Sequence, residues 1–363
     1  MIKRIGLFLI ITIVFVGCSS GQLNEDQTGI VVDVNGVIEV VNEEILAESL
    51  EIPWSITISG DTFYLTERGG SIVKVDDGQA VRESLKLSEP VLSIGECGLL
   101  GLELHPDFEN NNLAFLYHTY GTENNVKNRI VLVEKMADSW QERSVLLDNI
   151  KGARIHNGGR LKIGPDNKLY VTTGDASDTS LSQDKDDLAG SILRMNLDGT
   201  IPTDNPFPDS YVYSYGHRNP QGLTWNESNN VMYASEHGPS GRDEINIIES
   251  GKNYGWPIIT GDETQEGMVS PLFHSGSDTW APSGMVYKDG LLYVAGLRGN
   301  NVYAFDLEQK TVEELYNGVG RIRDVLLSQN GIYIITNNTD GRGMLTPGDD
   351  KLIHLELVKS RES

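Results

Sequence analysis

The feature that most constrains the fold of this chain is a unit that recurs six times along it. Each copy has a short apolar run typical of a β-strand, a turn rich in Asp, Asn and Gly, and a second such run with an aromatic residue near its start. The copies lie about 40 to 60 residues apart, which is the spacing of propeller blades. The six aromatic residues are Tyr64, Phe115, Tyr170, Tyr233, Tyr293 and Tyr333.

The runs predict at least three strands in each repeat. The first runs cover 54–58, 101–104, 159–163, 221–225, 283–287 and 323–327, and the second cover 62–65, 113–116, 168–171, 231–234, 291–294 and 331–334. Third runs follow over 71–75, 129–135, 192–196, 245–248, 301–306 and 351–357. Long helical periodicity is absent after the N-terminal segment. The sequence therefore predicts an all-β fold, a six-bladed β-propeller.

The first 18 residues have the pattern of a lipoprotein signal peptide. Lys3 and Arg4 form a basic region, and the apolar run over 5–16 is too short to span a bilayer comfortably as a helix. The segment ends in a sequence that resembles the bacterial lipobox, in which the cysteine, here Cys18, is acylated. Phe15 stands where Leu, Val or Ile is usual, so a simple signal peptide that happens to contain Cys is the alternative.

This N-terminus divides the chain into three parts. Residues 1–18 are the predicted signal peptide, 19–35 are a polar, acidic tether, and 36–363 are the propeller. We therefore expect an exported protein that is anchored to the cell membrane only by its N-terminal lipid, with the propeller outside the cytoplasm. Cys97 is then left without a partner in the chain, so no disulfide is expected.

The chain is strongly acidic, with a net charge of −23. This argues against nucleic acid as a partner, because phosphates require a basic protein face. In a propeller the first strand of each blade lines the central axis, so the residues just before these strands should meet at one mouth of the channel. Those positions hold Glu96, His156, Arg218 with Asn219, 279–283, and Arg321 with Arg323.

A group of arginines in so acidic a chain indicates a buried anionic ligand held by guanidinium contacts. Taken alone, each arginine is more often a surface or strand-pairing residue, and a histidine before Gly-Gly is more often a turn residue. The prediction depends on their shared position in the repeat.

Seven ordered motifs between Pro53 and Asp350 resemble one known family, the soluble quinoprotein sugar dehydrogenases of the glucose/sorbosone dehydrogenase group. Within it, the chain looks most similar to the bacterial aldose sugar dehydrogenases. The motifs are 95–102, 105–108, 156–161, 216–222, 236–239, 243–246 and 253–257.

This resemblance implies a six-bladed propeller that binds pyrroloquinoline quinone (PQQ), a planar tricarboxylate, on the axis together with calcium. His156 matches the family's general base, which also lies against the cofactor. Arg218 and Asn219 match contacts to the quinone, and Arg321 with Arg323 matches the pair that faces the cofactor carboxylates.

The resemblance assigns further residues around the same cofactor. Gly238 and Pro239 match residues whose backbone carbonyls bind the calcium. Two more cofactor contacts are expected at Arg298 and Thr279. Glu96 stands where some members have Gln, and Cys97 replaces a glycine that is common in the family. That exchange puts the local backbone in question, because cysteine adopts positive φ less freely than glycine.

An acidic group that includes Glu236, Asp243 and Glu244 either binds or supports calcium, or is a solvated loop. Calcium fits the hard oxygen ligands, and the sequence contains no Cys/His set of zinc spacing.

The chemistry that follows is oxidation of the C1 hydroxyl of an aldose to a lactone. A neutral imidazole is suited to remove the hydroxyl proton while a hydride leaves the carbon, and Arg218 with calcium stabilises charge on the acceptor. The expected partners are a sugar and an electron acceptor that the sequence does not identify, and the chain is a monomer or a homodimer. The alternatives are a non-catalytic extracellular binding propeller and a calcium-dependent propeller hydrolase or lactonase.

Overall fold

β-Strands dominate residues 38–358, the part of the chain that the computed structural model describes. The helices in this part are α1 (Phe108–Asn111) and two short 3-10 helices, η1 (Leu181–Gln183) and η2 (Asn338–Asp340). None of the helices within 38–358 is long and apolar enough to cross a membrane. The predicted signal peptide, Cys18 and the tether lie outside the described residues and stay predictions.

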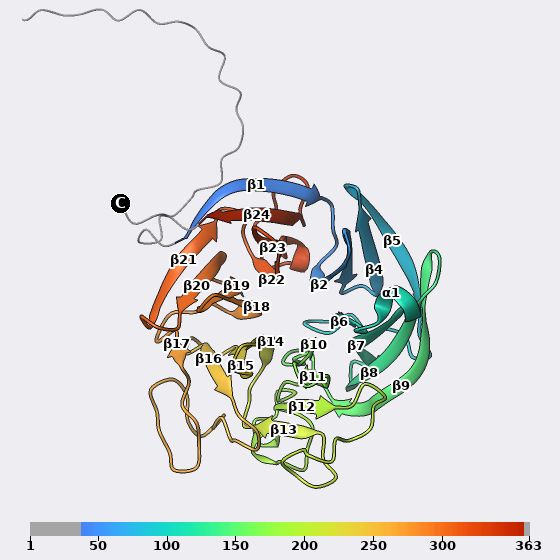
Figure 1. The fold of residues 1–363 in the computed structure, drawn as a ribbon. Helices are drawn as coiled ribbons and strands as arrows, with labels where there is room; N and C mark the ends of the chain where they lie inside the picture. The colour runs from blue at the N-terminus through green and yellow to red at the C-terminus, as the bar shows by residue number, and fades with distance from the viewer. Residues whose placement is uncertain (1–37, 359–363) are drawn as a thin grey trace, which may run out of the picture.

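The strands form sheets arranged as a ring around a central axis (Figure 1). Three four-stranded sheets follow chain order from the axis outward. The first contains β10 (Leu161–Ile163), β11 (Leu169–Thr172), β12 (Ser191–Met195) and β13 (Val212–Tyr215). The second contains β14 (Pro220–Asn226), β15 (Val231–Glu236), β16 (Glu244–Ile248) and β17 (Phe273–His274). The third contains β18 (Pro282–Lys288), β19 (Leu291–Gly296), β20 (Asn301–Asp306) and β21 (Thr311–Asn317).

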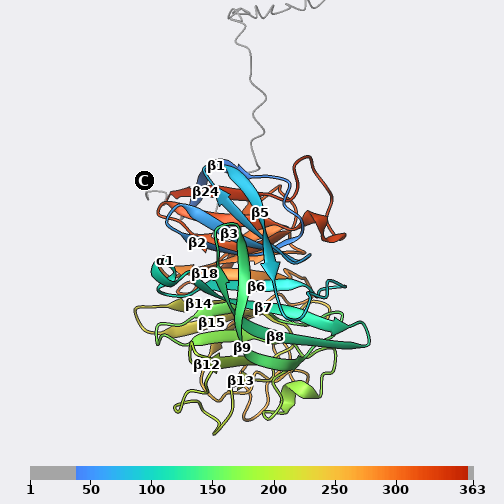
Figure 2. The ribbon, with the colours of Figure 1, turned by 90° about the vertical axis from the view of Figure 1, so that its right-hand side faces the viewer.

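A fourth four-stranded sheet joins the two ends of the propeller. Its order is β22 (Ile322–Leu327), β23 (Gly331–Thr336), β24 (Leu352–Val358) and β1 (Glu39–Ala47). β1 runs antiparallel to β24, from the pair Glu39 and Val358 to the pair Ala47 and Leu352 (Figure 2). An N-terminal strand therefore completes a sheet made by the C-terminal end of the chain, which closes the ring without a covalent link.

The remaining eight strands form one sheet. It contains two antiparallel runs, β2 (Pro53–Ser59), β3 (Thr62–Glu67), β4 (Ser71–Asp76) and β5 (Gln79–Lys86), and β6 (Leu99–Leu104), β7 (Leu113–Thr122), β8 (Asn125–Lys135) and β9 (Ser139–Lys151). The outermost strands β5 and β9 pair in parallel, with Ser84 opposite Ser139 and Lys86 opposite Gln141. The described residues thus form five hydrogen-bonded sheets, where the repeats predicted six separate blades.

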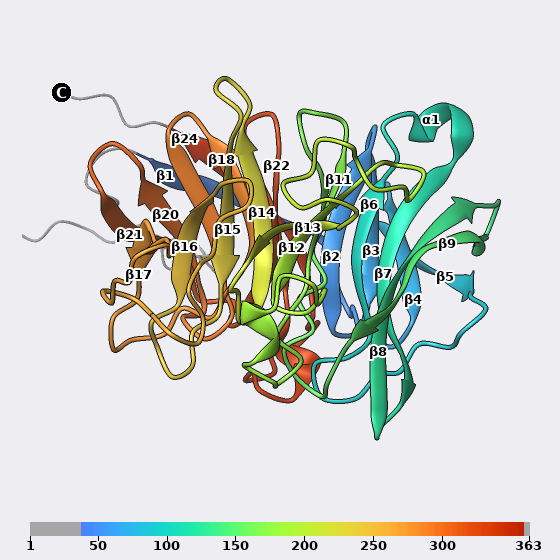
Figure 3. The same cartoon turned by 90° about the horizontal axis from the view of Figure 1, so that it is seen from below.

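The predicted repeat otherwise matches the strands. Every first run is a strand next to the axis, namely β2, β6, β10, β14, β18 and β22 (Figures 1 and 3). Each second run is the next strand outward and carries the predicted aromatic residue. These aromatics pack between sheets: the ring of Tyr170 on β11 meets Trp225 on β14 edge to face at 5.1 Å, and Tyr233 on β15 stacks on Tyr287 on β18 at 6.1 Å. The repeat is therefore also a unit of packing between neighbouring sheets.

Candidate active site

One end of the axis gathers the residues that precede the inner strands. A cavity of about 460 Å³ opens there and is lined by six of the predicted residues, Gly238, Pro239, Asp243, Thr279, Arg298 and Arg321. A smaller cavity of about 20 Å³ lies deeper, against Glu96 and Arg323. Both cavities are lined by His237, Leu297 and Arg342, so these three residues form their shared wall. We call this region the arginine mouth.

A third, very small cavity adjoins the arginine mouth. Its volume is about 10 Å³, and its lining includes Arg218, Glu236 and Trp256. His156 lines none of these three cavities. Its backbone N–H donates to Glu96 Oε2 at 3.1 Å, and its ring contacts the same carboxylate, Asp175, that binds Trp256. The structure thus ties His156 to the edge of the arginine mouth through Glu96 and Asp175.

The His156 side chain is held in a fixed orientation. Its Nδ1 lies 2.7 Å from Asp175 Oδ1, and 12% of the side chain is exposed. Its φ of +63° is uncommon for a residue other than glycine, and such backbone conformations concentrate at functional sites. A side chain at Gly174 would collide with the His156 carbonyl oxygen, so the tight approach of these two loops requires glycine. The ring's second nitrogen, Nε2, has no partner among the described residues.

Asp175 orients this histidine. The carboxylate is fully buried, and besides His156 it accepts the backbone N–H of Ser177 on Oδ1 at 2.8 Å and the indole N–H of Trp256 on Oδ2 at 2.9 Å. A buried carboxylate on Nδ1 fixes the tautomer and leaves Nε2 as the proton acceptor. This geometry is compatible with the general base that the sequence predicts at His156.

Arg218 and Asn219 present donors without partners. Arg218 Nη1 donates to the His237 carbonyl at 3.2 Å, its guanidinium lies 5.3 Å from the Trp256 ring centre, and its Nε is buried and unpartnered. Burial lowers the pKa of Arg218. Asn219 Oδ1 accepts the Gly158 N–H at 3.0 Å, while its Nδ2 has no acceptor.

Arg321, just before β22, and Arg323, on β22, differ in whether a carboxylate neutralises their charge. Arg321 donates to Asp340 Oδ2 and to the Leu297 carbonyl, both at 2.9 Å. Arg323 donates only to neutral oxygens, on Gln221 at 2.8 Å and Asn337 at 3.1 Å, with a longer contact to Ser283. Burial lowers the pKa of Arg323 to about 9, and Arg321 contributes to this by its own charge. Each of the two has a buried, unpartnered Nε.

Asp243 organises the loop that carries the expected calcium-binding carbonyls. Its Oδ1 accepts the Gly238 N–H at 2.8 Å. Its Oδ2 accepts the Thr279 hydroxyl at 2.8 Å and the backbone N–H groups of Trp280 at 2.7 Å and Ala281 at 2.8 Å. Both oxygens are thus engaged by donors, and Asp243 joins the two loops that line the mouth.

Glu236 is engaged in the same way. It contacts His217 Nδ1 at 2.8 Å and accepts the backbone N–H of Arg218. Within 38–358 no group of three or more His, Cys, Asp or Glu side chains is placed to hold a metal ion. Direct binding of calcium by Glu236 or Asp243 remains a prediction, and the contacts seen are supporting ones.

Comparisons with known proteins identify the family of this chain. The profile described as "Glucose / Sorbosone dehydrogenase" matches residues 50–346. The chain belongs to the glucose/sorbosone dehydrogenase family. Members of this family are oxidoreductases that act on CH–OH groups, which confirms the enzyme class and the family expected from the motifs.

Individual relatives cover most of the chain. The aldose sugar dehydrogenase YliI of Escherichia coli is 30% identical over 83% of this chain and 91% of its own length. Quinoprotein glucose dehydrogenase B of Acinetobacter calcoaceticus is 33% identical over 63% of this chain and 55% of its own. The PQQ-bound aldose sugar dehydrogenase of Streptomyces coelicolor superposes with a TM-score of 0.82 at 35% identity, covering 88% of this chain and 98% of that one. The similarities to the Escherichia coli and Streptomyces coelicolor enzymes therefore cover more than four fifths of this chain.

Several residues of the dehydrogenase site escaped the sequence prediction. None of Asp175, Trp256, Arg342 and Arg68 precedes an inner strand, and the resemblance assigned no role to Trp256 although it lies in the motif 253–257. Arg342 reaches Glu96 Oε1 at 3.1 Å from the loop after β23, although the two are 246 positions apart. Burial raises the pKa of Glu96, but His237, the His156 N–H and Arg342 outweigh it, so the net pKa is lowered.

Cys97 causes no backbone strain in this dehydrogenase. It is absent from the residues with positive φ, and the neighbouring Gly95 (+55°) and Gly98 (+152°) take those conformations instead. The buried thiol donates to the Ala153 carbonyl at 3.0 Å and lies 3.6 Å from Asn157 Nδ2. Cys97 therefore packs against the loop that leads to His156, and the doubt raised by the exchange of glycine is removed.

Below the arginine mouth, a buried ion pair crosses the axis. Arg160 Nη1 lies 2.6 Å from Asp324 Oδ2, which also accepts the backbone N–H of Ile56 at 3.0 Å. Arg160 Nε donates to the Gln221 carbonyl at 2.8 Å, and its guanidinium lies 4.4 Å from the Trp54 ring centre. This pair joins four inner-strand regions of the ring.

We expect Arg160→Gln to lower the free energy of unfolding by about 3–5 kcal/mol, because it leaves the buried Asp324 carboxylate without its charge partner. Urea unfolding measures this. The double variant Arg160→Gln, Asp324→Asn should recover much of the loss, since no unpaired charge then remains. Equal losses in the single and double variants would contradict the pairing.

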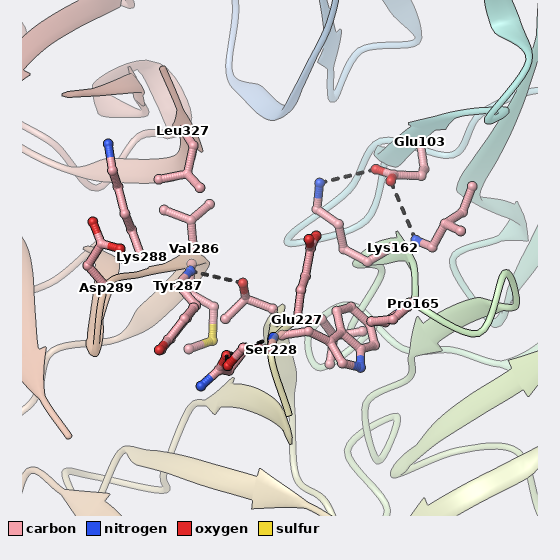
Figure 4. A pocket seen from close by; sticks show the side chains of 17 residues that line it. Glu103, Lys162, Pro165, Glu227, Ser228, Val286, Tyr287, Lys288, Asp289 and Leu327 are labelled. Atoms are coloured by element: carbon pink, nitrogen blue, oxygen red, sulfur yellow. Dashed lines mark hydrogen bonds and ion pairs between the residues drawn. The ribbon is translucent and has the colours of Figure 1, made fainter. Parts of the chain in front are cut away.

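The opposite end of the axis holds a larger cavity of about 640 Å³ (Figure 4). Lys162 there lies 3.1 Å from Glu103, and Trp225, Glu227 and Tyr287 also line it. Neither histidine nor arginine is among the residues that line it. The arginine mouth, although it is the smaller cavity, is the candidate active site, because the titratable and unpartnered groups gather there.

Proposed function

We propose that this protein is a PQQ-dependent aldose sugar dehydrogenase that oxidises the C1 hydroxyl of sugars to lactones. The observation that carries the proposal is the set of unpartnered, buried side-chain nitrogens around the arginine mouth. They are Arg218 Nε, Asn219 Nδ2, His237 Nε2, Arg321 Nε and Arg323 Nε. Burying an unpaired polar group costs free energy, so such a set calls for a ligand that is rich in acceptors.

A planar tricarboxylate quinone meets this requirement. Its carboxylates would accept from Arg321 and Arg323, with Arg298 and Thr279 nearby, and its carbonyl oxygens would accept from Arg218 and Asn219. The cavity of about 460 Å³ is within the size of small-molecule sites. His237 adds a neutral imidazole with an unpartnered Nε2, because burial lowers its pKa to about 4. That nitrogen is either a donor or an acceptor according to its tautomer.

Calcium would be held by the backbone carbonyls of Gly238 and Pro239. Hard oxygen donors of this kind suit calcium. Asp243 fixes the loop through the Gly238 N–H, and Glu236 fixes the adjacent Arg218 backbone. Their part is to hold the ligating loop in place.

The chemistry assigned to this chain is proton removal and charge stabilisation. His156 Nε2 takes the proton of the C1 hydroxyl, and Asp175 stabilises the imidazolium that forms. When bound, the quinone supplies the acceptor for the hydride that leaves C1. Arg218, whose position is set by Trp256 and His237, provides positive charge where negative charge develops. The proton later returns to solvent through the part of the His156 ring that is exposed.

The propeller is proposed to have six blades, two of which share the eight-stranded sheet through β5 and β9. Each antiparallel run of that sheet has its own inner strand, which supports this count. Export with lipid attachment at Cys18, a tether over 19–35, and a monomeric or homodimeric state are likewise proposals, carried by the N-terminal sequence pattern and by the resemblance.

The test is reconstitution of purified apoprotein with PQQ and calcium in the presence of an artificial electron acceptor and an aldose. We expect sugar-dependent reduction of the acceptor. Removal of calcium with a chelator should weaken quinone binding, measured by calorimetry, by about tenfold or more, because the metal neutralises charge beside the quinone. A folded protein that binds quinone but oxidises no sugar would favour a binding propeller, and one that hydrolyses lactones without quinone would favour the hydrolase.

A further inference from the structure

One indole ring contacts two of the side chains to which the proposed reaction assigns a role, Asp175 and Arg218. The Nε1–H of Trp256 donates to Asp175 Oδ2 at 2.9 Å, and Asp175 in turn holds His156. The face of the same ring lies 5.3 Å from the Arg218 guanidinium carbon, which is a cation–π contact. The N–H at the edge of the Trp256 ring thus binds the carboxylate that holds His156, and the face of the ring contacts Arg218.

The backbone of Trp256 is fixed on both sides. Its N–H donates to the Gly216 carbonyl at 2.9 Å, and its carbonyl accepts from Gln183 Nε2 at 2.7 Å. Gly255, just before it, has φ of +85°, and a side chain there would collide with Ile259. The backbone that carries the ring is therefore held by the loop after β16, through contacts other than those of the ring itself.

The orientation of the Asp175 carboxylate relies on the hydrogen bond from Trp256. Oδ1 has two donors, His156 and the Ser177 N–H, while Oδ2 has only the indole within the described part of the chain. Because Asp175 is fully buried, water does not replace a lost donor there. Loss of the indole N–H would leave one oxygen unpaired and allow the carboxylate, and with it the imidazole, to turn.

We propose that Trp256 is a positioning residue that couples the two halves of the site, holding His156 through Asp175 and Arg218 through its ring face. This rests on the proposed function, in which His156 is the base and Arg218 faces the acceptor. Trp256 acts through other residues and does not itself take part in the chemistry.

The first test uses reconstituted enzyme with Trp256→Phe, which keeps a ring face for Arg218 and removes the N–H. We expect kcat to fall about tenfold, because a misplaced base loses part of its contribution, with KM for sugar and quinone affinity changed by less than about threefold. Trp256→Leu removes both contacts and should also weaken quinone binding. Trp225→Phe, the same exchange at the opposite end of the axis, is the matched control and should leave kcat unchanged.

The second test is a proton NMR measurement on the apoprotein and needs neither quinone nor sugar. A proton shared between His156 Nδ1 and Asp175 should give a slowly exchanging low-field proton NMR signal, assigned by its loss in His156→Ala. We expect the signal to be present in the wild type and in Trp225→Phe, and to broaden or disappear in Trp256→Phe. If Trp256→Phe destabilises the fold, benzothienylalanine at position 256, which has sulfur in place of the indole N–H, repeats the test with the ring shape preserved.

The outcomes separate this inference from the proposed function. An unchanged signal together with unchanged kcat in Trp256→Phe, or in the sulfur analogue, overturns the positioning role. Absence of sugar oxidation in the wild type overturns the proposed function, and the NMR comparison still decides whether Trp256 holds the His156–Asp175 pair.

Discussion

Replacement of His156 with alanine is expected to lower kcat by about 10²–10⁴-fold, the usual contribution of a positioned general base. Quinone affinity should change by less than about threefold, because no cavity wall at the arginine mouth is formed by the His156 ring and the arginines and the carbonyl loop stay in place. Steady-state kinetics with saturating quinone and calcium, and calorimetry of quinone binding, measure the two quantities separately.

The matched control is His354→Ala, which removes a half-buried histidine on β24 that contacts Ser328 at 3.0 Å. Its kcat should equal that of the wild type. If His156→Ala lost quinone binding while the bound fraction turned over normally, His156 would be a cofactor contact and not the base.

Arg323→Gln is expected to weaken quinone binding by roughly 10- to 100-fold, the loss of a charge-assisted hydrogen bond to a carboxylate. The free energy of unfolding of the apoprotein should fall by no more than about 1.5 kcal/mol, because Arg323 has only neutral partners and no ion pair is broken. Calorimetry gives the affinity, and urea unfolding gives the stability.

Two variants with the same substitution make this result interpretable. Arg143→Gln removes an exposed arginine that pairs with Glu134 on the outer strands and should leave quinone binding intact. Arg160→Gln, also buried beside Trp54, should mainly cost stability. Wild-type quinone affinity in Arg323→Gln would show that the unpartnered guanidinium has another purpose.

The contrast between Arg160 and Arg323 explains how an acidic protein can bind an anion. Both guanidinium groups are buried near the Trp54 ring, at 4.4 and 5.9 Å from its centre. Arg160 is neutralised by Asp324, so its charge is internal to the fold. Arg323 has no carboxylate and lies in a medium that lowers its pKa to about 9, so its charge is available to a ligand, which would in turn raise that pKa.

The positions of most strands could be predicted from the sequence because the signals for each strand lie within a few neighbouring residues. The alternation of apolar residues, the turn residues and the aromatic anchors such as Tyr170 and Tyr293 all lie within one repeat. β1 was missed because its sequence, which has three glutamates in nine residues, is only partly buried and gains its place by pairing with β24 at the far end of the chain. The parallel pairing of β5 with β9 was missed because neither strand carries a signal for its neighbour.

The sequence by itself determined which side chains lie at the mouth of the axis, because in a closed ring the residues just before the inner strands all lie at the same end of the axis. His156, Arg218, Arg321 and Arg323 were found in this way. Only the tertiary structure decided which of the charged groups are neutralised and which remain free. Asp324 lies 164 positions from Arg160, and Trp256 lies 81 positions from Asp175, so these contacts are set by distances in space that no local pattern records.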